Sequence, residues 1–148
     1  MEASDRAVRG LAAGFIGTVA LTASQRIEMR LTGRPPSDLP ARVAEGILGI
    51  APTGRRRELV GTAAHWCNNT ASGLGRVVLD RAGLRGSRAA AAGFVLYLGG
   101  SALLFARLGL APPPWRRPPR QLAIEAVHAA VWASATNAAY ELMAPDGR

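Results

Sequence analysis

Charged and uncharged residues alternate in long blocks along this chain. Four stretches of 15 to 18 residues contain no Asp, Glu, Lys or Arg: 10–25, 59–75, 89–106 and 126–140. A soluble helix of this length normally carries charged side chains along its whole outer face. The segregation into blocks therefore favours membrane helices, although each block is somewhat shorter than the roughly 20 residues that span a bilayer.

Glycine and proline mark where the helices around these blocks end. Gly33, Gly83 and Gly109 end the first three, because glycine accepts the left-handed conformation at a helix C-terminus, and Pro145 lies beyond the fourth. No alternating strand pattern occurs. We therefore expect an all-α, four-helix transmembrane bundle that forms a single domain over 1–148. The predicted helices cover about 5–31, 54–82, 87–108 and 119–143, with a short amphipathic helix over 40–48 between the first two.

Two other interpretations of the pattern stay open. Four amphipathic helices of this length also form soluble bundles. The N-terminus also fits a secretory signal, since Arg6 and Arg9 precede the apolar run and small residues follow around Ala23. The charged continuation of the first helix through Glu28 and Arg30, together with three further uncharged blocks, favours a retained membrane helix.

The amino-acid composition limits the kinds of partner that we expect the chain to bind. The 148 residues include 18 arginines, no lysine and one cysteine, with a net charge of +8. Such a chain either binds nucleic acid or places its arginines at membrane surfaces. One cysteine excludes a disulfide framework within the chain. Because no aromatic platforms accompany the arginines, we expect a lipid bilayer and no nucleic acid as the partner.

The arginines are distributed unevenly. Eleven lie in segments 26–57 and 107–120, against six in the two tails and the loop after the second helix. This asymmetry predicts both segments in the cytoplasm and both termini outside. Arg9, Arg26, Arg76 and Arg107, near the ends of uncharged blocks, are expected to reach the headgroups. Two clusters are expected to contact headgroups or set the topology: Arg55, Arg56, Arg57, Arg116, Arg117 and Arg120.

Two segments of the chain have similar sequences. Residues 12–16 (AAGFI) and 91–95 (AAGFV) match, and each is followed by a double proline, arginines and a helix with one histidine. Two related helical hairpins explain the match, with chance as the alternative. In a four-span bundle the second and fourth helices run in the same direction, so His65 and His128 are expected about 10 Å from one membrane face.

Polar residues follow one face of the second predicted helix. They recur in steps of three and four, within about 60° of one line: Glu58, Thr62, His65, Asn68, Asn69, Ser72 and Arg76. In a soluble protein these residues would form the solvent-exposed face of the helix. In a membrane they must pair with one another or line a hydrated cavity, and hydrogen bonding between helices is our first expectation.

The fourth predicted helix places Gln121, Glu125, His128 and Trp132 on one side, with Glu125 and His128 spaced to hydrogen-bond. Carboxylate-bridged metal sites use a Glu-x-x-His pair twice, and two histidines at one depth also fit haem ligation. The chain has one such pair, so we expect no metal and no cofactor. Nucleophile and phosphate-loop motifs do not occur, so we expect no enzymatic activity.

Small residues line one face of the first and third predicted helices. Gly10, Gly14 and Gly17 lie on one, and Gly93 and Gly100 on the other. Such stripes predict close helix contacts, either inside the protein or with a second copy or another membrane protein.

One part of the chain resembles a known family. Residues 109–132 resemble the C-terminal half of the YagU-like proteins, and the Ala-Ala-His-Trp-Cys-Asn segment over 63–68 resembles a feature of an earlier helix in that family. The residues that carry the first match are Gly109, Leu110, Pro112, Pro113, Trp115, Glu125, His128, Val131 and Trp132. The resemblance implies a small multi-pass protein of the bacterial inner membrane, of unassigned activity.

Three functional hypotheses follow. The first is a non-enzymatic structural, interaction or stress-related membrane component. The second is a protein that conducts protons or small solutes along a polar path with His65 and His128, whose imidazoles ordinarily titrate near neutral pH. The third is a soluble or peripheral basic helical protein that binds nucleic acid or anionic lipid.

Overall fold

Helices account for all the regular structure of the chain. The structure, a computed structural model, describes residues 3–144, and no strand occurs among them. The predicted all-α class and the amphipathic helix are thus confirmed, while Pro145 lies outside the described residues. The elements are α1 (Ala3–Thr32), α2 (Leu39–Leu48), α3 (Gly54–Ser72), α4 (Leu74–Arg81), α5 (Gly86–Arg107), the 3₁₀ turn η1 (Pro114–Arg116) and α6 (Pro119–Leu142).

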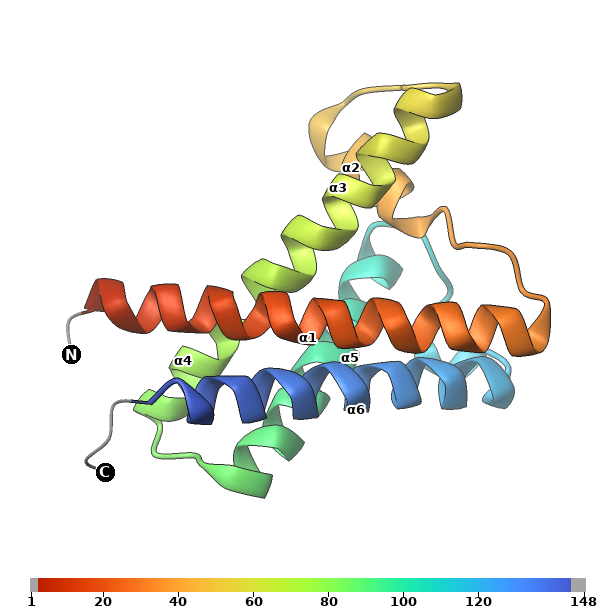
Figure 1. The fold of residues 1–148 in the computed structure, drawn as a ribbon. Helices are drawn as coiled ribbons and strands as arrows, with labels where there is room; N and C mark the ends of the chain where they lie inside the picture. Colours follow the sequence, from red (N-terminus) through yellow and green to blue (C-terminus); the bar gives the residue numbers. More distant parts are fainter. Residues whose placement is uncertain (1–2, 145–148) are drawn as a thin grey trace.

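Helices α1 and α6 form an antiparallel central pair (Figure 1). Helices α3 and α4 pack on α1, and α5 packs mainly on α6, both crossing the central pair obliquely. Helix α2 packs on α3. Helices α3 and α5 are not among the closely packed pairs of the described chain. If the chain consisted of two equivalent hairpins, α1 would correspond to α5 and α3 to α6. The contact between α1 and α6 would then have a counterpart between α5 and α3. Because α3 and α5 are not closely packed, the arrangement is not symmetric here.

The single helix predicted over 54–82 is wrong in one respect, because it is interrupted at Gly73. The amide of Gly73 donates to the Thr70 carbonyl and the amide of Arg76 donates to the Gly73 carbonyl, each at 3.0 Å, which is 3₁₀ geometry. The interruption lies where the helix meets α1. A Cβ on Gly73 would lie 2.6 Å from the Cα of Gly14, so the backbones touch directly.

The glycine stripe of α1 confirms the prediction of close helix contact. Gly10 and Gly14 pack against Gly73, and Gly17 lies against α6, where a Cβ would be 3.1 Å from the Trp132 indole nitrogen. The stripe of α5 is packed at one end only. A Cβ on Gly93 would be 3.9 Å from Ala133 of α6 and from Leu79 of α4, whereas a Cβ on Gly100 would meet no atom within 4 Å, so the Gly100 end borders open space.

Burial in this fold is inverted relative to a soluble protein. Small and polar residues make up much of the interior, beside a few large side chains such as Leu21, Trp132 and Tyr140, while many large apolar side chains, among them Phe15 (51% exposed) and Val127 (58% exposed), face outward. Among the described residues, α1 and α5 are long and apolar enough to cross a membrane. Only 11% of the apolar window of α5 is buried, so this helix is not the hidden core of a soluble domain.

Candidate functional site

The polar stripe predicted on one helix face lines two adjoining cavities. The larger one, of about 1230 Å³, is bordered by Glu58, Thr62, His65, Asn68 and Asn69. The smaller one, of about 270 Å³, is bordered by Asn68, Ser72 and Arg76. The smaller cavity is lined by α3, α4, α5 and α6, and the larger one by α3, α5 and α6 together with the end of α1 and α2. We call the two cavities together the groove. They share five lining residues: Asn68, Tyr97, Ser101, Leu104 and Phe105.

His65 of α3 and His128 of α6 each contact a hydroxyl group of α1, and these two hydroxyl groups are close together on the helix. His65 Nε2 lies 3.1 Å from the Thr22 hydroxyl, and His128 Nδ1 lies 2.9 Å from the Ser24 hydroxyl. Thr22 and Ser24 are two residues apart, a rise of about 3 Å along a helix. The histidines therefore lie at nearly the same level, and both line the larger cavity.

Two hydrogen bonds and one ring contact lead from His65 across three helices. The Asn69 amide nitrogen donates to the His65 carbonyl at 2.7 Å, and the Tyr97 hydroxyl donates to the Asn69 side-chain oxygen. The Tyr97 ring stacks on Trp132, with the ring centroids 4.3 Å apart. Helices α3, α5 and α6 are thereby joined at the point where the two cavities meet.

We expect Tyr97→Phe to lower the free energy of unfolding by about 1 kcal/mol, the usual net value of one hydrogen bond. Tyr97→Leu should cost more, because it also removes the stacking on Trp132. Thermal unfolding of both variants in detergent measures the difference. A Tyr97→Phe variant as stable as the parent would show that the hydroxyl contributes nothing, and equal losses in the two variants would show that the stacking contributes nothing.

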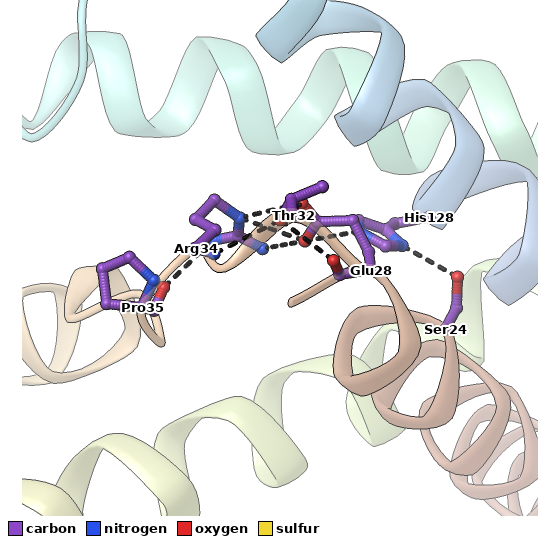
Figure 2. A network of polar contacts seen from close by, with 6 residues as sticks. All are labelled: Ser24, Glu28, Thr32, Arg34, Pro35 and His128. Carbon is purple, nitrogen blue, oxygen red and sulfur yellow. Dashed lines mark hydrogen bonds and ion pairs between the residues drawn. The ribbon is translucent and has the colours of Figure 1, made fainter. Parts of the chain in front are cut away.

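His128 belongs to a second network at the C-terminal end of α1, shown in Figure 2. Its Nε2 lies 3.9 Å from the Glu28 carboxylate, which forms a 2.6 Å ion pair with Arg34 and accepts a hydrogen bond from Thr32. The predicted hydrogen bond between Glu125 and His128 is wrong. Glu125 instead accepts hydrogen bonds from Arg117 at 2.7 Å and from Gln121 at 3.0 Å.

The other end of the groove holds a network of charges. Arg76 donates to Asn137 at 2.8 Å and to Glu141 at 3.2 Å. The guanidinium groups of Arg76 and Arg9 lie over the ring of Tyr140, at 4.5 Å and 3.7 Å from its centroid. Arg9 also pairs with Asp80 at 3.8 Å.

The expectation that Arg9 and Arg76 reach headgroups is thus wrong, because both are buried and paired inside the protein. Sequence reasoning missed Tyr140 and Glu141 as partners. Glu141 could have been found from the sequence. It lies near the end of the fourth predicted helix, which runs in the same direction as the second and so brings its carboxylate to the level of Arg76.

The predicted headgroup arginines divide into two groups. Arg55, Arg56, Arg116 and Arg120 are exposed, as a headgroup contact requires. Arg57 donates to Glu45 at 2.7 Å, and this hydrogen bond raises the pKa of its guanidinium. Arg117 is buried, because its side chain donates to the Pro112 carbonyl and pairs with Glu125. The structure therefore places Arg117 in the groove wall rather than on the headgroup surface.

Within residues 3–144, no group of three or more His, Cys, Asp or Glu side chains is arranged to hold a metal ion. Cys67 is exposed and does not line the groove. The groove accordingly offers imidazoles, amides, hydroxyls and ion pairs, which are groups that bind and orient polar molecules.

Comparison of the chain with models of known families, with curated proteins and with solved structures gives no match.

Proposed function

We propose that this chain is a polytopic protein of the bacterial inner membrane, as the YagU-like resemblance implies, and that it acts there as a non-enzymatic structural or interaction component. In this proposal α1 and α5 cross the bilayer together with the uncharged parts of α3–α4 and α6. The observation that carries the proposal is the inverted burial of side chains, with buried polar residues such as Arg76 and Asn69 and outward Phe15 and Val127.

The energetics of this distribution favour a lipid surround. Burying one large apolar side chain away from water contributes about 1.5–3 kcal/mol, and many such side chains are exposed along α1 and α5. In a bilayer these side chains contact lipid, while the buried polar groups bond to one another as intramembrane residues must. Water around the same surface would leave all these apolar side chains hydrated, whereas monomeric soluble proteins keep contiguous exposed apolar surface small.

The arrangement of the arginines supports the predicted orientation. The C-terminal end of α1, α2, the start of α3, and the segment from the end of α5 to the start of α6 all meet at the larger cavity. Eleven of the 18 arginines lie in these segments. One end of the molecule is therefore much more basic than the other, which favours that end in the cytoplasm.

Fractionation tests the proposal. We expect the protein to stay in the membrane pellet after high-salt and alkaline carbonate washes and to require detergent for extraction, because its lipid-facing surface is apolar. Recovery in the carbonate supernatant would overturn the proposal in favour of a peripheral basic protein.

A second candidate function is the passage of protons or small polar solutes. The observation that favours it is the presence of His65 and His128 in one cavity, linked through Thr22 and Ser24 of the same helix. Imidazole exchanges protons near neutral pH more readily than any other side chain.

For this candidate we expect the double variant His65→Ala/His128→Ala to abolish pH-dependent flux into proteoliposomes, because no imidazole then remains in the chain. Flux is measured with a pH-sensitive dye inside the vesicles. Cys67→Ala, a change on the exposed face of the same helix as His65, serves as the control. Flux that is unchanged in the double variant counts decisively against histidine-dependent passage.

A further inference from the structure

The groove is nearly as long as a membrane is thick. Its polar stripe extends from Glu58 to Arg76, which corresponds to roughly 27 Å at about 1.5 Å per residue. The hydrocarbon core of a bilayer measures about 30 Å. If α3–α4 lies in the bilayer, the stripe provides polar groups at nearly every depth, with Asn68, Asn69 and Ser72 between the two ends.

The groove is open along its side except at two places, where the Tyr97 hydroxyl of α5 donates to Asn69 of α3 and where α4 contacts α5. Helices α3 and α5 are not closely packed, and the small residues Gly75 and Gly100 on the facing helices leave the space between them unfilled. Leu96 and Leu104 of α5 line the smaller cavity and are also exposed on the outer surface. A polar stripe on one wall and exposed leucines on the other fit a molecule that has a polar head and apolar tails.

Charges of both signs line the two ends of the groove. Arg117 with Glu125 and Arg34 with Glu28 lie at one end, and Arg76 with Glu141 lies at the other. The buried guanidinium nitrogens Arg76 Nη1 and Arg117 Nη2 have no hydrogen-bond partner within the described chain. An arginine donor beside a carboxylate complements a headgroup with a phosphate and an ammonium group.

From these observations we infer that the groove carries phospholipid headgroups between the two leaflets while the acyl chains stay in the surrounding lipid. This inference rests on the proposed membrane location of the chain. A headgroup that enters the hydrocarbon core loses its hydration. The polar side chains of the groove replace part of that hydration at each depth and so lower the free-energy barrier to crossing. A second copy of the chain over the groove would seal it and remove this activity.

The test uses the purified full chain in vesicles of phosphatidylethanolamine and phosphatidylglycerol that contain a trace of headgroup-labelled fluorescent phosphatidylethanolamine. Dithionite bleaches the label in the outer leaflet only, so a second bleaching phase reports lipid that has crossed. We expect the parent protein to show this phase. Gly100→Leu should slow it by about tenfold or more, because the new side chain enters the groove and raises the barrier.

Gly99→Leu is the matched control. Gly99 is the neighbouring residue of α5, a Cβ there also meets no atom within 4 Å, and it does not line the groove. We expect this variant to transfer lipid like the parent. Gly75→Leu fills the groove from the opposite wall and repeats the test if Gly100→Leu does not yield a monodisperse protein in gel filtration.

The outcomes separate the two proposals. Protein that floats with the vesicles and resists carbonate but shows no second phase would overturn the lipid path and leave the membrane location intact. Equal rates in the parent, Gly100→Leu and Gly75→Leu would overturn it as well. Bleaching of a water-soluble label trapped inside the vesicles would show that the groove passes small solutes. A stable dimer without lipid transfer would show that the groove binds a second copy of the chain. Protein that fails to float contradicts the membrane location itself.

Discussion

Gly73→Ala is expected to lower the free energy of unfolding by about 2–3 kcal/mol, the upper range of overpacking effects. The added methyl group would collide with backbone atoms of α1, including the Cα of Gly14 at 2.6 Å, and backbone cannot rotate out of the way as a side chain does. Thermal unfolding in detergent, followed by circular dichroism, measures the loss.

The control for this experiment lies two residues further along the chain. A Cβ on Gly75 meets no atom within 4 Å, so Gly75→Ala should raise stability by up to about 1 kcal/mol through better helix propensity. The two substitutions are chemically identical and are predicted to have opposite signs. A stabilising effect of both would mean that α1 and α4 do not approach each other at Gly73.

Arg76→Met is expected to destabilise the protein by about 3 kcal/mol. The thioether keeps much of the side-chain volume, but the Asn137 oxygen loses its donor and Glu141 loses its ion pair. The stacking on Tyr140 loses its charge as well. Unfolding in detergent gives the magnitude.

Arg81→Met provides the comparison within α4. Arg81 is exposed, so its replacement should change stability by less than about 0.5 kcal/mol. Adding Glu141→Gln to Arg76→Met should recover part of the loss, because no carboxylate then remains that has lost its ion-pair partner. Similar stabilities of Arg76→Met and Arg81→Met would contradict the network described at this end of the groove.

Most of the local structure could be predicted from the chain itself. The uncharged blocks and the glycines after them located the helices, since hydropathy and turn preference act through neighbouring residues. The amphipathic segment over 40–48 appears as α2 for the same reason. The polar stripe on α3 and α4 was also visible, because helical periodicity places its members on one face in any tertiary context.

The partners of these residues could not be predicted in the same way. Glu125 is spaced to bond His128 within its own helix, yet it pairs with Arg117, which the turn after α5 brings nearer. Two stripes of small residues looked equivalent, yet the one on α1 packs tightly and the one on α5 borders the groove. The interruption at Gly73 likewise depends on the approach of α1.

The sequence by itself therefore determined the helical class, the approximate helix boundaries, the polar face and the uneven distribution of the arginines, because each of these follows from the residue types within a few turns of one helix. Only the tertiary structure decided that Arg9 and Arg76 enclose Tyr140, that both histidines bond to α1 and that α3 and α5 lie apart. These features depend on which helices become neighbours, and that choice is made by packing between residues more than 40 positions apart.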